Sequence, residues 1–109
     1  MYTADMDTPL TTRREVVERL TAQRVAILGV GVRRLGLFGS FLSDNPRGDS
    51  DVDLLVEFEP SRKTYDNYFR LSELLERELR RSVDLLTTEG LSPYIGPRIL
   101  AEVEYVALG

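Results

Sequence analysis

The sequence predicts one α/β (α+β) domain, in which about four helices pack on a small mixed sheet of three to four strands. The chain has 109 residues, close to the commonest size of a single domain, so residues 1–109 are treated as one unit. Short apolar runs typical of strands alternate with stretches whose apolar residues recur at helical spacing. The content of 42% apolar and 29% charged residues is typical of a folded chain rather than a disordered one.

The first helix is predicted to begin near Thr8-Pro9 or at Thr12. Proline suits the first helical position, and Thr12 and Glu15 have the spacing of a capping box. Gly29 and Gly31 can end this helix, because glycine readily takes the left-handed conformation of a helix C-terminus.

The other elements follow from apolar runs, helical stripes and turn-forming residues. In chain order they are a strand at 32–38, a helical turn at 40–43, a loop at 43–50, a strand at 51–58, a helix at 64–81, a strand at 82–87, a loop at 90–97, a helix at 98–103 and an edge strand at 105–108. The core stripe of the long helix consists of Tyr68, Leu71, Leu74, Leu75 and Leu79. Arg80 and Arg81 are expected at its solvated end, where cations complement the helix dipole.

Cysteine and histidine are both missing, and their absence narrows the chemistry that the chain can perform. The chain has no cysteine, which excludes disulfides, thiolate zinc sites and cysteine nucleophiles. It has no histidine either, which removes the commonest general base and the Ser-His-Asp triad. Any reaction must therefore use carboxylates, hydroxyls, lysine, arginine, backbone amides or a hard metal ion.

The charge balance is acidic. Eighteen acidic and fourteen basic residues give a net charge of −4, which argues against direct binding of nucleic acid. No apolar run approaches the roughly 20 residues of a membrane span. The segment from Met1 to Asp7 is polar and acidic, unlike a signal peptide. We therefore expect a cytoplasmic protein with no membrane association.

Three features indicate a site. Gly39-Ser40 directly follows a predicted strand, Asp51 and Asp53 begin the next strand, and Asp84 is the one charge in the third. Side chains two residues apart on a strand share a face, so Asp51 and Asp53 are expected side by side. If the third strand lies beside the second, Asp84 completes a cluster of three carboxylates. Such a cluster is unfavourable without a cation.

This donor set predicts a chemistry. Oxygen ligands favour Mg²⁺ or Mn²⁺, which also bind phosphate oxygens. Gly39 permits close approach of a ligand to the backbone, and Ser40 offers a hydroxyl and an amide to phosphate. Arg47, between the motifs, is the arginine expected to contact phosphate. Together they indicate metal-assisted phosphoryl-type transfer from a nucleoside triphosphate.

Other readings of these residues stay open. Tyr65 or Tyr94 could stack on a nucleobase, although exposed tyrosines are common. The acidic residues at 49–53 could simply form a turn. A calcium loop fits poorly, because Leu54 would stand where glycine is needed and Pro60 where glutamate is needed.

The motifs resemble a known superfamily. Gly39-Ser40, ten further residues, then Asp51-Val52-Asp53 and a later strand aspartate resemble the nucleotidyltransferase superfamily that includes DNA polymerase beta. Residues 37–41 and 49–56 look very like the minimal nucleotidyltransferases. The resemblance extends over essentially the whole chain and implies the nucleotidyltransferase fold.

The resemblance also implies roles. Asp51 and Asp53 would hold two Mg²⁺ ions, with Asp84 as third ligand and acceptor of the proton from the attacking hydroxyl. Gly39 and Ser40 would bind the triphosphate of ATP. Many members are antitoxins that associate with a HEPN-type RNase toxin as a hetero-oligomer. Those of this type transfer AMP to a tyrosine of the toxin.

One departure from the family pattern motivates an alternative. Ser43 and Asp44 stand where the family loop commonly has arginine and glycine, whereas its second arginine is kept as Arg47. The alternative is therefore an antitoxin with weak or no catalysis that neutralises its partner by binding alone. A third possibility is a nucleotidyltransferase that acts on a small molecule. The short length of the chain argues against it.

Overall fold

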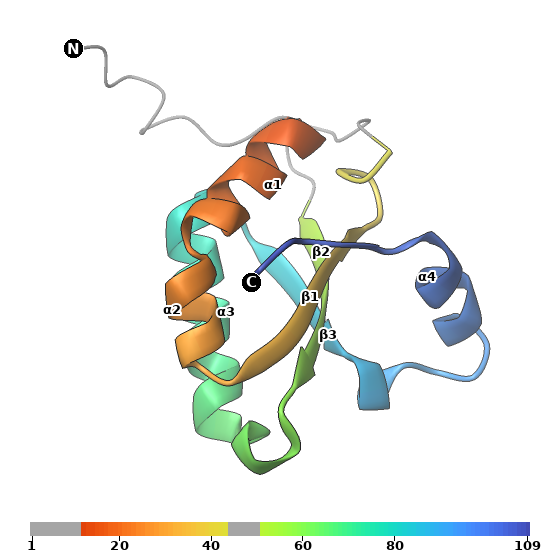
Figure 1. The fold of residues 1–109 in the computed structure, drawn as a ribbon. Helices are drawn as coiled ribbons and strands as arrows, with labels where there is room; N and C mark the ends of the chain where they lie inside the picture. The colour runs from red at the N-terminus through yellow and green to blue at the C-terminus, as the bar shows by residue number, and fades with distance from the viewer. Residues whose placement is uncertain (1–11, 44–50) are drawn as a thin grey trace.

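The computed structural model describes residues 12–43 and 51–109, and its centre is a mixed four-stranded sheet (Figure 1). The strands are β1 (Val32–Phe38), β2 (Val52–Phe58), β3 (Val83–Thr87) and β4 (Glu104–Tyr105), in the spatial order β3-β2-β1-β4. β1 is antiparallel to both β2 and β4, whereas β2 and β3 are parallel. The predicted fold class is therefore confirmed.

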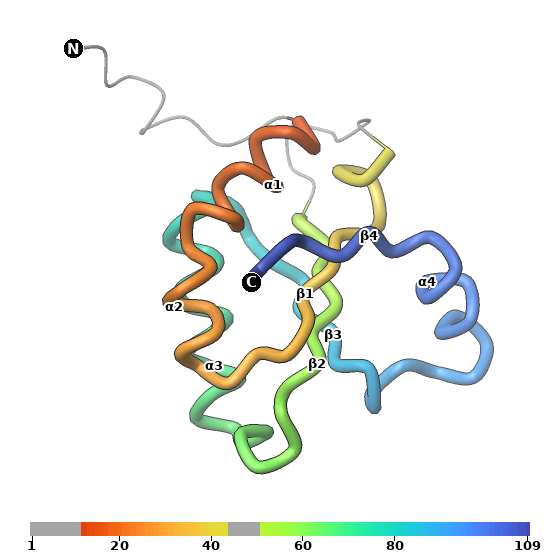
Figure 2. The backbone as a smooth tube through the Cα atoms, viewed as in Figure 1, coloured from red at the N-terminus to blue at the C-terminus, as the bar shows by residue number. Residues whose placement is uncertain are grey.

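The helices lie on both faces of this sheet. Figure 1 shows α1 (Arg13–Ala22), α2 (Arg24–Gly29) and α3 (Tyr65–Leu79) on one face and α4 (Gly96–Glu102) on the other. The tube in Figure 2 shows the same division, with α4 separated from the other helices by the strands. The face under α4 is the one that carries the candidate site.

The first helix begins as predicted but does not run unbroken. The Thr12 hydroxyl accepts a hydrogen bond from the Glu15 amide, and the Glu15 carboxylate accepts one from the Thr12 amide. The alternative start at Thr8-Pro9 lies outside the described residues. The single predicted helix is wrong, because the chain leaves helical geometry at Gln23 (φ −101°, ψ 16°). The two pieces pack on different neighbours, α1 on α3 and α2 on β1, which requires this break.

Most predicted boundaries differ by one or two residues. α3 ends at Leu79 because Arg80 takes left-handed geometry (φ 55°). Gly31 is left-handed (φ 97°) as predicted, whereas Gly29 is simply the last residue of α2. α4 begins at Gly96, two residues earlier than expected, with Pro97 in its first turn.

The last strand is shorter than predicted. Only Glu104 and Tyr105 form β4, because Val106 and Leu108 turn into the core and are 8% and 7% exposed. Two short 3₁₀ helices, Pro60–Arg62 and Thr88–Gly90, follow β2 and β3.

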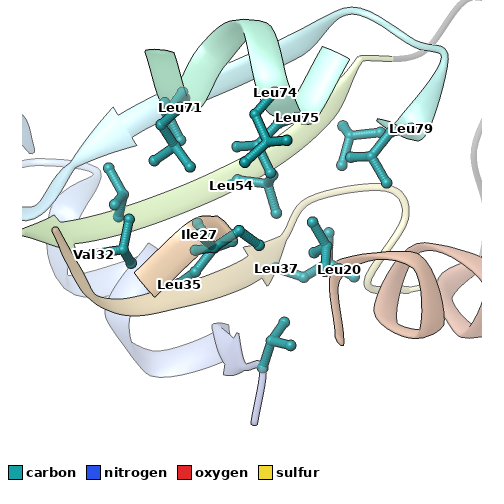
Figure 3. Packing of buried hydrophobic residues seen from close by; sticks show 14 of the residues in the cluster. Leu20, Ile27, Val32, Leu35, Leu37, Leu54, Leu71, Leu74, Leu75 and Leu79 are labelled. Carbon is teal, nitrogen blue, oxygen red and sulfur yellow. The ribbon is translucent and has the colours of Figure 1, made fainter. Parts of the chain in front are cut away.

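The main core lies between the sheet and the three helices. Leu71, Leu74, Leu75 and Leu79 of α3 are buried against β1, β2 and α2, and Figure 3 shows them facing Leu54, Leu35 and Ile27. Tyr68 packs against this core and is partly buried, so the predicted stripe is confirmed. A smaller core of Phe38, Leu55 and Ile99 lies under α4.

The alternation along β2 places the site. Leu54 and Val56 point into the main core, whereas Leu55 points toward α4. By the period of two in a strand, Asp53 shares the face of Leu55.

No helix within the described residues is long and apolar enough to cross a bilayer.

Candidate active site

Sheet register brings the three sequence motifs together at one end of the sheet. Phe38, the residue before Gly39, lies opposite Asp53, and Asp53 lies opposite Asp84 on the parallel strand. β1 ends where β2 and β3 begin, so the turn after β1 and both carboxylates meet at the same edge. The prediction that the third strand lies beside the second is confirmed.

The carboxylates differ in exposure. Asp53 is partly buried, whereas Asp51, just before β2, and Asp84 are exposed. A backbone hydrogen bond joins the start of β2 to the residue before β3, since the Val52 amide donates to the Ser82 carbonyl at 3.0 Å. The site is thus one partly buried carboxylate with two more accessible ones beside it.

Gly39 is fixed by both conformation and contact. Its φ of 78° lies in the left-handed region, where only glycine is unstrained. A Cβ at this position would collide with Oδ2 of Asp53 and lie 2.9 Å from its Cγ. The close approach that the sequence predicted is therefore made by the chain's own carboxylate, which rests on the Gly39 backbone.

The segment after Gly39 is a hydrogen-bonded turn, as predicted for 40–43. The Ser43 amide donates to the Gly39 carbonyl at 3.3 Å, and the Ser43 hydroxyl donates to the Ser40 carbonyl at 3.1 Å. From the start of α1, Nη1 of Arg13 donates to the Leu42 carbonyl at 3.3 Å. These bonds define the shape of the turn that presents Ser40.

A buried ring anchors the same turn. Phe41 is completely buried, and the guanidinium carbon of Arg81 lies 5.0 Å from the centre of its ring. Arg81 is partly buried, so the prediction that it lies at a solvated helix end is wrong, whereas Arg80 is exposed as expected. The sequence places Arg81 near the candidate site, because it precedes Asp84 by only three residues.

The electrostatics follow from this packing. Burial, and next the charges of Asp84 and Asp51, raise the pKa of Asp53 to about 6. An ionised Asp53 is therefore unfavourable in the folded chain on its own. A cation beside it would offset that cost.

The donor set fits a hard divalent cation. It consists of carboxylate oxygens only, and Asp53 is close enough to both neighbours for their charges to act on it. Across residues 12–43 and 51–109, no three acidic side chains already form a group arranged to hold a metal ion. Mg²⁺ does not need three, because it is commonly held by one or two carboxylates together with substrate phosphates. Arg47, the predicted phosphate contact, lies outside the described residues.

A separate pocket lies at the opposite end of the same strands. It measures about 470 Å³ and is lined by Phe58, Lys63, Thr64, Tyr65, Tyr68, Phe69 and Thr87. Phe58 follows Asp53 by five residues of strand, roughly 17 Å. Tyr65 therefore lies at the end of the strands opposite Ser40, which argues against its stacking on a base bound at that turn.

The turn at Gly39 lies against the carboxylate of Asp53, which is paired with Asp84 across the strands. This arrangement is typical of sites that bind a phosphate group together with a divalent cation. The comparisons with known proteins agree. The family model described as nucleotidyltransferase domain matches residues 13–106. The chain belongs to this nucleotidyltransferase family, which confirms the resemblance seen in the motifs and the class of enzyme expected from it.

Individual relatives are consistent with this assignment. The chain is 38% identical over 96 residues to the protein adenylyltransferase MntA of Thermococcus cleftensis, covering 87% of this chain and 96% of that protein. A solved structure described as a candidate minimal nucleotidyltransferase has 38% identity and a TM-score of 0.67, over 81% of this chain and 93% of its own. A toxin–antitoxin structure with AMP-PNP shares the fold at 17% identity and a TM-score of 0.64, over 82% and 73% of the two chains.

Gly39→Ala is expected to destabilise the protein by about 2 kcal/mol, because the left-handed backbone is strained and the Asp53 carboxylate is displaced. Urea unfolding measures the free energy. Gly29→Ala is the control, since a Cβ there meets nothing within 4 Å, and we expect it to be neutral or stabilising by less than about 1 kcal/mol. Equal stability of the two variants would contradict the close contact.

Asp53→Asn is expected to stabilise the metal-free protein at pH 7. The pKa of Asp53 rises from an ordinary 3.8 to about 6 in the folded chain, so folding favours its protonated form. Stability of the wild type therefore falls as the pH rises from about 4 to about 6, whereas the variant lacks this loss. Allowing for partial exposure, the difference at pH 7 is roughly 1 kcal/mol and shrinks toward pH 4.

Thermal unfolding with a chelator present, at a series of pH values, measures this difference. A variant that is less stable than wild type at pH 7 would show that the ionised carboxylate is not penalised, against our assignment.

Proposed function

We propose that this chain is a Mg²⁺-dependent protein adenylyltransferase that transfers AMP from ATP to a hydroxyl of a HEPN-type RNase toxin, and so acts as an antitoxin. One observation carries the proposal: the Asp53 carboxylate lies between the Gly39 turn and Asp84. The naming of the Thermococcus relative as a protein adenylyltransferase supports the choice of reaction.

The turn after β1 binds the triphosphate. Backbone amides and the Ser40 hydroxyl donate to phosphate oxygens, and Gly39 keeps the backbone free of a side chain at that point. Arg13 and the Ser43 hydroxyl hold this turn through hydrogen bonds to the Leu42 and Ser40 carbonyls. Arg47 adds a charged contact from the loop between the motifs.

The carboxylates prepare the reacting groups. Asp51, Asp53 and Asp84 would hold Mg²⁺, which would supply positive charge to neutralise the phosphates and the attacking oxygen. Asp84, the exposed member on β3, accepts the proton of the acceptor hydroxyl. The acceptor oxygen forms a bond to the α-phosphorus, the bond from that phosphorus to the β-phosphate oxygen breaks, and pyrophosphate leaves.

The partner supplies the acceptor. The exposure of Asp51 and Asp84 leaves the reacting edge open to a second protein, and we expect a hetero-oligomer with the toxin. The toxin–antitoxin structures that share this fold support such an assembly. A single domain over 1–109, a cytoplasmic location and the lack of nucleic-acid binding stay predictions.

Co-expression with a HEPN-type toxin of the same genome tests the reaction. We expect the toxin's intact mass to increase by one AMP moiety or a small number of them with wild type, and to stay unmodified with Asp53→Asn. Growth of the cells reports neutralisation in the same experiment. Identical, unmodified toxin masses with both proteins would contradict the transferase assignment.

The binding-only alternative makes a different prediction in this experiment. It is favoured by Ser43, whose hydroxyl bonds within the turn where the family pattern has an arginine. Under it, the toxin stays unmodified yet growth is restored, by Asp53→Asn as well as by wild type.

A further inference from the structure

β3 is an edge strand, and Asp84 lies near its beginning. Within residues 12–43 and 51–109, β3 pairs with β2 on one side and with no strand on the other. At such an edge, alternate backbone groups have no partner strand. Asp84 is itself exposed, so burial of its own side chain does little to fix it. Its place therefore depends on how the backbone of β3 is held.

Two side chains of α3 bond to the backbone of β3, one on each side of Asp84. The Tyr68 hydroxyl donates to the Leu85 carbonyl at 2.7 Å. The Glu76 carboxylate accepts a hydrogen bond from the Val83 amide at 3.1 Å. Because both bonded backbone groups belong to the immediate neighbours of Asp84, the two bonds hold the segment that carries this carboxylate.

The side chains of the same segment alternate between the two faces of the sheet. Val83 and Leu85 pack in the main core, together with the leucines of α3. By the strand period of two, Asp84 faces the opposite side, and Asp53 is its partner in the register. A slip of β3 by one residue would turn Asp84 into the core. Bonds that hold the backbone at Val83 and Leu85 therefore also hold the carboxylate toward the site.

The two bonds are strengthened in different ways. Tyr68 is partly buried, and a hydrogen bond between hydroxyl and carbonyl is stronger where it is shielded from water. Glu76 is exposed, but an ionised carboxylate is a stronger acceptor than a neutral group. Each bond is therefore suited to holding a strand that has a neighbouring strand on one side.

We propose that Tyr68 and Glu76 are positioning residues, which hold Asp84 where it binds the metal ion and accepts the proton of the acceptor hydroxyl. They act through the backbone of β3, from a helix that lies on the face of the sheet opposite α4 (Figure 1). This inference rests on the proposed function, because it assigns a role toward a metal ion at Asp84.

Calorimetric titration of Mn²⁺ into the chain saturated with AMP-PNP tests this role without turnover. Tyr68→Phe removes only the hydroxyl, and should weaken Mn²⁺ binding about three- to tenfold, the range expected for one lost hydrogen bond. Tyr65→Phe is the matched control, at a tyrosine of the same helix that is 83% exposed. It should stay within about twofold of wild type.

Two replacements of Glu76 separate its hydrogen bond from its charge. Glu76→Gln retains an oxygen that accepts from the Val83 amide, and should bind Mn²⁺ within about twofold of wild type. Glu76→Ala loses the bond and should bind about three- to tenfold more weakly. Glu73→Ala, at an exposed glutamate of the same helix, is the control and should be unchanged. Equal weakening in Glu76→Gln and Glu76→Ala would overturn the positioning role of Glu76.

A double-mutant cycle with Asp84→Asn separates positioning from a general effect on the fold. Because Tyr68 acts through Asp84, Tyr68→Phe should change Mn²⁺ binding by less than about twofold once Asp84→Asn is present. The rate of AMP transfer to the toxin at saturating ATP should follow the same pattern. Thermal unfolding of each variant shows that it is folded at the temperature of the titration.

The outcomes are distinct. If Tyr68→Phe and Glu76→Ala both bind Mn²⁺ as tightly as wild type, the inference is overturned and the proposed function stands. If Tyr68→Phe weakens binding equally with and without Asp84→Asn, it acts on the fold as a whole, and positioning of Asp84 is overturned. If wild type itself binds neither AMP-PNP nor Mn²⁺, the proposed function fails and the inference fails with it.

Discussion

The site depends on one contact, that of the Asp53 carboxylate with the backbone of Gly39. It requires a glycine in left-handed geometry at the end of β1 and a strand residue that faces away from the main core. The contact holds a partly buried carboxylate beside two others, which raises its pKa. The folded chain accepts an unfavourable charge there, which is expected of a site that gains stability when a cation and a phosphate group bind.

The two cores make this arrangement possible. The main core of leucines on β1, β2 and α3 carries most of the buried apolar surface, so the other face can be covered by one short helix. Because α4 covers only part of that face, Asp84 stays exposed while Leu55 and Phe38 are buried. The same sheet thus offers a rigid side and an accessible side, and the chemistry belongs to the accessible one.

Local signals in the sequence predicted most of the fold and the strand residues of the site. Alternation along β2 and the spacing of Gly39-Ser40, Asp53 and Asp84 placed these residues on one edge, because strand period and pairing follow simple rules. The break at Gln23 and the stacking of Arg81 on Phe41 were not predictable in this way. Both depend on which elements pack against each other, and that is a property of the tertiary structure.

The most direct test of the account is a crystal structure of the chain with AMP-PNP and Mn²⁺, in which anomalous scattering locates the metal. We predict metal between Asp53 and at least one of Asp51 and Asp84, with the triphosphate on the turn that begins at Gly39. Nucleotide and metal bound instead in the aromatic pocket around Tyr65, at the other end of β2 and β3, would contradict it.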